Sequence, residues 1–151
     1  MTADYKIAII GSGPGGLSAA GHAAELNVPH VLIEKASHLS DTLFKFQKGK
    51  FVMSTPDVLP LRSPMAFTAG KREDILGNWD DTAASLKVNV RLNSEVVGIE
   101  GEKGNFTIKM ADGATVTAET VILGIGLQGN LNKLRVPGAD LPHIQYQLDD
   151  P

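Results

Sequence analysis

The segment YKIAIIGSGPGG, residues Tyr5–Gly16, decides how this chain folds. Its first half is a short and almost continuous apolar run, which is typical of a parallel strand buried on both faces. Its second half has glycines at the spacing G-x-G-x-x-G, and the alanine-rich stretch from Pro14 to about Leu26 predicts a helix directly after the strand. Asn27 and Pro29 should end that helix, because Asn tolerates a left-handed conformation and Pro cannot continue a helix.

A second apolar run, His30–Glu34, follows the predicted helix. Strand, helix and strand within about 30 residues form a βαβ unit, in which the two strands lie side by side and parallel. The chain is therefore predicted to be an α/β protein with a central parallel sheet.

The glycines of the turn and the acid of the second strand together predict a site for a dinucleotide. Gly11 should make the tight turn, Gly13 should let the backbone approach a pyrophosphate, and Gly16 should let helix and strand pack closely. The following helix offers unpaired N–H groups and a partial positive charge to phosphates. Glu34 stands where a carboxylate can accept both hydrogen bonds from an adenosine ribose, and it would repel a 2′-phosphate, which disfavours NADP in this site. The alternatives are a glycine turn without a ligand and a surface carboxylate.

The middle of the chain departs from a simple succession of βα units. Residues 35–70 have weak periodicity, three prolines and four of the five phenylalanines, which is too irregular and too long for a simple connection. We expect a short helix near Thr42–Phe46 there, followed by irregular chain. Lys71–Leu86 predicts another helix, with Trp79 as its core anchor.

Further strands are predicted in the last third of the chain. One should join the main sheet, three should form a small antiparallel meander packed on one side, and the last should be a buried apolar strand that ends in Gly124-Ile125-Gly126. The turns of the meander are predicted at Lys103-Gly104 and Asp112-Gly113. In chain order, the predicted strands are Val88–Leu92, Glu95–Glu100, Asn105–Met110, Thr115–Thr117 and Thr120–Leu123.

Composition excludes several classes of protein. The chain has 151 residues and a formal charge of −3, with 42% hydrophobic and 21% charged residues, which is typical of a globular domain and argues against nucleic acid as a partner. It has no cysteine, so these residues cannot form disulfides, thiolate metal sites or a Cys-x-x-Cys redox pair, and the four scattered histidines predict no metal site. The polar start and the lack of an apolar run long enough to span a membrane predict a cytoplasmic location.

Four motifs in a fixed order make the chain resemble a known family. GSGPGG, then VLIEK, then SEVVGIE, then TVILGIG with VPG resembles the flavin-binding half of thioredoxin-reductase-like, pyridine-nucleotide-dependent flavoprotein oxidoreductases. The resemblance covers nearly the whole chain. It implies a Rossmann-like FAD/NAD(P)-binding domain with a central parallel sheet and an antiparallel β-meander. It also implies an FAD-dependent oxidoreductase that transfers a hydride from NADH or NADPH to FAD and on to an unknown acceptor.

The same resemblance implies roles for single residues. The glycines of the turn would surround the pyrophosphate of FAD, Glu34 would bind the adenosine ribose, and the strand bearing Val96 would offer backbone groups to the adenine. Gly126 would match the last glycine of the family's Ala-Thr-Gly turn near the flavin, although Ile125 replaces the Thr and cannot make its hydrogen bond. No catalytic residue is predicted. The predicted cofactor-binding residues are Gly11, Ser12, Gly13, Pro14, Gly15, Gly16, Glu34, Lys35, Val96 and Gly126.

The resemblance also bears on domains and partners. We expect residues 1–151 to be the FAD-binding domain of a longer reductase, whose nicotinamide-binding domain would begin about where this sequence stops. An electron-acceptor protein is an expected partner, and a homodimer is left open. Two other interpretations remain at this point: an NAD-binding Rossmann domain of another dehydrogenase, and a non-catalytic nucleotide-binding module.

The segment Phe44–Phe51 interleaves aromatic residues with lysines. The favoured interpretation is an amphipathic stretch whose phenylalanines pack inward and whose lysines are solvated. The alternative is a surface that binds nucleic acid or an acidic partner such as an electron-transfer protein.

Overall fold

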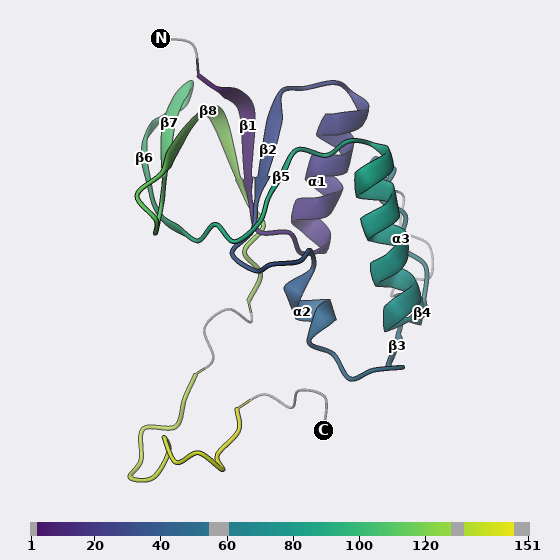
Figure 1. Ribbon diagram of the computed structural model, residues 1–151, viewed down its shortest axis with the longest axis vertical. Helices are drawn as coiled ribbons and strands as arrows, with labels where there is room; N and C mark the ends of the chain where they lie inside the picture. Colours follow the sequence, from purple (N-terminus) through teal and green to yellow (C-terminus); the bar gives the residue numbers. More distant parts are fainter. Residues whose placement is uncertain (1–2, 55–60, 128–131, 147–151) are drawn as a thin grey trace.

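The computed structural model describes residues 3–54, 61–127 and 132–146, and it shows an α/β fold built on one mixed sheet (Figure 1). The sheet has six strands in the order β5-β2-β1-β8-β7-β6, and β3 and β4 pair separately. In chain order, the elements are β1 (Tyr5–Ile10), α1 (Pro14–Glu25), β2 (His30–Ile33), α2 (Asp41–Phe44), β3 (Phe51–Val52), β4 (Gly70–Lys71), α3 (Arg72–Ser85), β5 (Val90–Arg91), β6 (Val96–Glu102), β7 (Asn105–Met110) and β8 (Thr115–Leu123).

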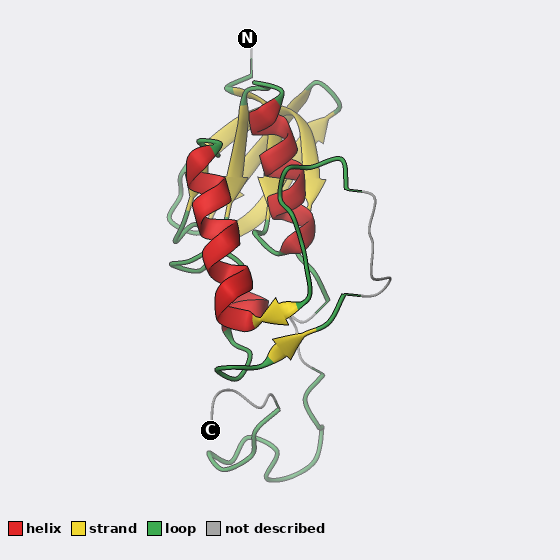
Figure 2. Cartoon of the chain, turned by 90° about the vertical axis from the view of Figure 1, so that its right-hand side faces the viewer, coloured by secondary structure: helices red, strands yellow, loops and turns green. Residues whose placement is uncertain are grey.

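The parallel half of the sheet carries the predicted βαβ unit. β1 lies between β2 and β8 and runs parallel to both, and β2 is parallel to β5. Helix α1 connects β1 to β2, and it ends where Asn27 takes a left-handed conformation at φ 54°, as predicted. Helices α1 and α3 cover the same face of the sheet (Figure 2).

The two faces of β1 and β2 enter different parts of the core. Ile9 and Leu32 face the helices and pack with Leu17 and Trp79. Alternate residues face the other way and pack against the antiparallel strands, which curl over that side of the sheet (Figure 1). β2 is therefore buried along its whole length, and the prediction of strands buried on both faces is confirmed.

The meander and the last parallel strand share one continuous strand, which corrects the prediction. Thr115–Thr117 and Thr120–Leu123 were expected to be separate strands, and both belong to β8. The first part of β8 pairs antiparallel with β7, and its second part pairs parallel with β1. The polar Glu119 between them does not break the strand, because its side chain is half-exposed and binds Lys6 at 2.7 Å.

The end of β8 is exposed, which also corrects the prediction of a buried apolar strand. Leu123 is 61% exposed and Ile125 just beyond it is 64% exposed. The apolar composition of this strand indicates a buried face, but none of the described elements packs over its end.

The segment expected to be irregular contains a short ribbon that sequence periodicity could not reveal. Phe51 of β3 lies opposite Lys71 of β4, and each strand has two residues. The short helix before the ribbon is α2. Residues 55–60 of this segment lie outside the described residues.

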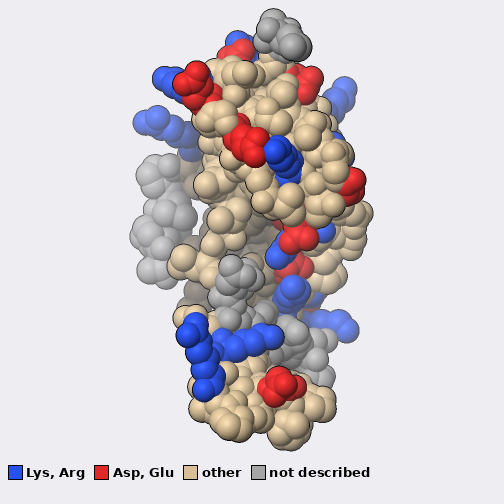
Figure 3. Space-filling view, turned by 90° about the vertical axis from the view of Figure 1, so that its left-hand side faces the viewer, with Lys and Arg blue, Asp and Glu red and all other residues tan. Residues whose placement is uncertain are grey.

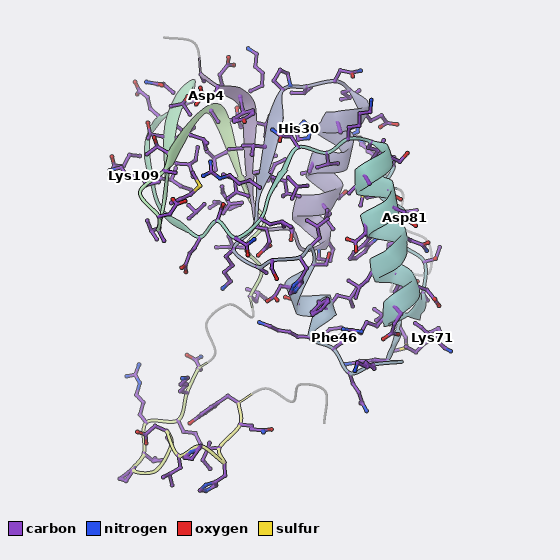
Figure 4. The ribbon with its side chains drawn as sticks, viewed as in Figure 1. Asp4, His30, Phe46, Lys71, Asp81 and Lys109 are labelled. Atoms are coloured by element: carbon purple, nitrogen blue, oxygen red, sulfur yellow. The ribbon has the colours of Figure 1, made fainter. Side chains whose placement is uncertain are left out.

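The favoured interpretation expected the phenylalanines of Phe44–Phe51 to pack inward, and only one of the three does so. Phe46 packs against the core below α2 (Figure 4). Phe44 is 45% exposed and Phe51 is 62% exposed. Helix α2 has a single turn whose buried residue is Leu43, so the neighbouring Phe44 faces outward and stacks on His38 with ring centroids 3.8 Å apart.

Candidate functional site

The glycine turn lies at the carboxyl edge of the parallel strands, where β1 passes into α1 (Figure 1). The chain leaves β1 to form β2 on one side, and β8 later returns to the other side of β1. This edge of β1 is therefore the position at which α/β sheets bind ligands, because the connections diverge there and leave a crevice.

Three glycines hold this turn together by close backbone contact. Gly11 has a φ of 93°, and a Cβ on it would lie 2.6 Å from the carbonyl oxygen of Gly124. A Cβ on Gly16 would lie 1.8 Å from the carbonyl oxygen of Gly11. These contacts confirm the tight turn at Gly11 and the close packing at Gly16 that the spacing predicts.

Gly124 is a part of the site that sequence reasoning missed. Its N–H donates to the carbonyl of Ile10 at 2.7 Å, and a Cβ on it would lie 3.1 Å from Cα of Gly16. The sequence signal was present, since an apolar strand ends directly in Gly124. Its contact with the first glycine turn follows only from the pairing of β8 with β1.

The other two glycines of the turn face open space. A Cβ on Gly13 would have the carbonyl oxygen of Gly124 as its nearest neighbour, at 4.0 Å, and a Cβ on Gly15 would meet nothing within 4 Å. Gly13 is the N-cap of α1, Pro14 is its first residue, and no side chain caps the helix or places an acid in its first turn. Because the first N–H groups of a helix have no intrahelical acceptor, this helix end can receive an anion.

Glu34 is held beside the turn by three hydrogen bonds. Its Oε2 accepts the N–H of Ser12 at 2.9 Å and the Ser12 hydroxyl at 2.6 Å, and its Oε1 accepts the N–H of Ala36 at 2.8 Å. Ser40, which the sequence did not mark as a site residue, donates its N–H to the Ser12 hydroxyl at 3.0 Å. We call Ser12, Glu34, Ala36 and Ser40 the Glu34 network. It ties the glycine turn to the loop after β2.

The loop before β6 is joined to the same place through the backbone. The N–H of Ser94 donates to the carbonyl of Glu34 at 2.9 Å, and the N–H of Asn93 donates to the carbonyl of Ala36 at 2.9 Å. Asn93 has a left-handed conformation at φ 52°, which turns the chain from β5 toward β6.

The remaining predicted site residues lie around this centre. Lys35 is exposed and directly follows Glu34. Val96 starts β6 opposite Met110, two residues after Ser94. Gly126 has a φ of 65° and open space around it, and it lies two residues after Gly124. The structure therefore brings the glycine turn and Glu34 into one cluster and places the other three at its margins.

Two hollows of the described surface lie away from the glycine turn. One, of about 400 Å³, is lined by His38, Asp80 and Val88, between α3 and the loop after β2. A second, of about 410 Å³, lies at the opposite edge of the sheet, near Tyr5 and His30. Neither of these two hollows contains a residue of the glycine turn, and the candidate site is identified by its backbone geometry.

Among the described residues, no helix is long and apolar enough to cross a membrane. The described part of the chain also contains no group of three or more His, Asp or Glu side chains that could hold a metal ion.

The chain was compared with known proteins. A family model described as pyridine nucleotide-disulphide oxidoreductase matches residues 8–151. The ferredoxin–NADP reductase of Leuconostoc citreum is 27% identical over 137 residues, which cover 90% of this chain and 38% of that protein. The chain thus spans well under half the length of this relative.

Solved structures show the same fold. The bacillithiol disulfide reductase of Staphylococcus aureus has a TM-score of 0.78 and 25% identity, over 94% of this chain and 44% of that one. The bacillithiol disulfide reductase of Bacillus cereus has a TM-score of 0.75 and 20% identity, over 91% of this chain and 44% of that one.

Proposed function

Because this chain belongs to the pyridine nucleotide-disulphide oxidoreductase family, we propose that it binds FAD at the glycine turn. We propose further that the protein is an oxidoreductase that passes a hydride from NADH or NADPH through FAD to an acceptor. The observation that carries this proposal is the uncapped start of α1 beside Glu34, with open space at Gly13 and Gly15. This arrangement suits a diphosphate joined to a ribose.

The residues present fit the cofactor. The N–H groups at the start of α1 would hold the diphosphate, and the absence of an acid in its first turn leaves the positive end of the helix dipole uncompensated. Glu34 would bind the adenosine ribose, β6 at Val96 would offer backbone groups to the adenine, and Gly126 would lie near the flavin. Bound FAD supplies the hydride chemistry, and the protein positions it and shields it from water.

The nicotinamide donor is proposed to bind outside these residues. The Leuconostoc reductase is named for NADP, whereas the carboxylate of Glu34 would repel a 2′-phosphate in the glycine-turn site. A separate site for the nicotinamide donor therefore fits these observations better than one site shared by both nucleotides. We propose that residues 1–151 are the FAD-binding domain and that a second domain holds NADH or NADPH.

The electron acceptor has two candidates among the relatives. One relative is named for ferredoxin, which is an electron-carrier protein, and another is named for a small disulfide. Residues 1–151 contain no cysteine, so a thiol pair for reducing a disulfide would have to come from another part of the protein. Because similar reductases of several bacteria carry the ferredoxin name, we propose transfer from the flavin to a protein acceptor, in a cytoplasmic enzyme.

Ligand extraction and reduction of the full-length protein test this proposal. We expect the purified protein to release FAD on denaturation, identified by its spectrum and by chromatography. We also expect NADH or NADPH, added without oxygen, to bleach the bound flavin. Release of NAD instead would favour another class of dehydrogenase. Bound flavin that neither donor reduces would show a binding module without turnover.

A further inference from the structure

The surroundings of the Ser12 hydroxyl leave Glu34 as the acceptor for its proton. Ser12 is fully buried, and its hydroxyl oxygen already accepts the N–H of Ser40 at 3.0 Å. Its single proton is therefore free to point at Oε2 of Glu34, which lies 2.6 Å away. The distance is typical of a strong, charge-assisted hydrogen bond.

The acceptor positions of Glu34 can be counted. A carboxylate offers about four lone-pair positions, two on each oxygen. Oε2 accepts two hydrogen bonds, both from Ser12, and Oε1 accepts one from the N–H of Ala36. One position remains, and it is on Oε1. A ribose has two neighbouring hydroxyls, and only one of them can be accepted while Ser12 keeps its place.

We propose that Ser12 is a positioning residue that restricts Glu34 to a single hydroxyl of the adenosine ribose. The inference rests on the proposed binding of FAD at the glycine turn. It differs from the two hydrogen bonds expected from the sequence, because the sequence does not show that Ser12 fills Oε2. Releasing Oε2 would leave the buried Ser12 hydroxyl without its acceptor, which is unfavourable in a site closed to water.

The test uses FAD and two FAD analogues that lack either the 2′- or the 3′-hydroxyl of the adenosine ribose. Their dissociation constants are measured with the full-length protein, freed of flavin, from the change in flavin fluorescence on binding. These probes report only on the flavin site, so a second nucleotide site does not interfere. We expect only one ribose hydroxyl to donate to the Glu34 carboxylate. The analogue that lacks this hydroxyl should bind roughly tenfold more weakly than FAD, and the other analogue should bind within about twofold of FAD.

Two variants separate positioning from general stability. In Ser12→Ala, Oε2 gains a free acceptor position for the other ribose hydroxyl. The analogue that the wild-type protein binds about as well as FAD should therefore bind this variant at least about threefold more weakly than FAD does. Ser37→Ala, which changes an exposed serine on the loop after β2, should keep the wild-type pattern. Should Ser12→Ala fail to fold, Ser12→Cys keeps the size and has only a weak donor.

Three results would overturn the inference while leaving FAD binding intact. These are equal weakening of both analogues in the wild-type protein, no weakening of either, or a wild-type pattern in the Ser12 variants. A protein that binds neither FAD nor its analogues would instead overturn the proposed function itself.

Discussion

Gly15 and Gly16 are neighbours in the same turn of α1, yet their surroundings are opposite. A Cβ on Gly16 would lie 1.8 Å from a backbone oxygen, which cannot move without shifting the turn, whereas a Cβ on Gly15 would meet nothing within 4 Å. The spacing of the glycines predicts the role of Gly16. It could not predict the hydrogen bonds of Ser12 and Ser40, because both join segments distant in the sequence.

Gly16→Ala should lower the free energy of unfolding by about 2–3 kcal/mol, or prevent folding, because the new methyl group overpacks a rigid contact. Gly15→Ala should change it by less than about 1 kcal/mol and is expected to raise it, because Ala is the better helix former. Urea denaturation of the full-length protein, followed by circular dichroism, compares the two. Equal stability of the two variants would contradict the close packing seen at Gly16.

β8 is the element that joins the two halves of the sheet, and Asp4 fastens it to the start of β1 (Figure 4). The carboxylate of Asp4 accepts the N–H of Thr117 at 2.9 Å and its hydroxyl at 2.8 Å. The sequence predicted every strand of the sheet in outline. The two strands predicted within β8 are separated by Ala118 and Glu119, where the polar Glu119 interrupts the apolar pattern, and strand pairing overrides that interruption.

The backbone hydrogen bond from Thr117, together with that of its hydroxyl, lowers the pKa of Asp4 below its usual value of 3.8. The stabilisation is therefore present above the pKa of the unfolded chain and is lost as pH falls through the lower, folded value. We expect the melting temperature of wild type to fall more steeply than that of Asp4→Asn between neutral pH and about pH 2. Asp140→Asn, at an exposed position, serves as the control. An identical acid decline in wild type and Asp4→Asn would contradict this role.

The face of the molecule formed by the antiparallel strands carries charges of both signs, and acidic and basic side chains are mixed over it (Figure 3). Lys109 of β7 pairs with Glu100 of β6, and Lys6 of β1 pairs with Glu119 of β8. This mixture is what a net charge of only −3 leads us to expect.

The lysines of the Phe44–Phe51 segment are expected to play no part in docking an acidic electron carrier. Lys45 binds Asp41 at 2.8 Å, and Nζ of Lys50 lies 4.2 Å from the centre of the Phe46 ring. Reversing the charges of Lys45, Lys48 and Lys50 together should leave the rate of carrier reduction within about twofold of wild type at low salt. Stopped-flow measurement with an acidic ferredoxin checks this. A fall of about tenfold or more would show that the segment docks the carrier.

The overall fold could be predicted because each strand and helix of the first βαβ unit has a local signal, and the glycine spacing indicates where the candidate site lies. The exposure of individual apolar residues could not be predicted in this way. Leu123 and Phe51 are apolar residues whose sequence context indicates burial, and both are more than half exposed among the described residues. Composition tells which residues are apolar, but only the packing of distant elements decides which of them are covered.

The affinity of the full-length Gly13→Val variant for FAD tests the central claim most directly. A side chain at Gly13 has room within the chain, since its Cβ would meet only the oxygen of Gly124 at 4.0 Å, but it would occupy the approach to the start of α1. Gly77→Val, in open space on α3, is the matched control. We predict that Gly13→Val folds with wild-type stability yet is purified without flavin and is not reconstituted by added FAD, while Gly77→Val keeps its flavin. A Gly13→Val protein that retains FAD with wild-type affinity would contradict the account.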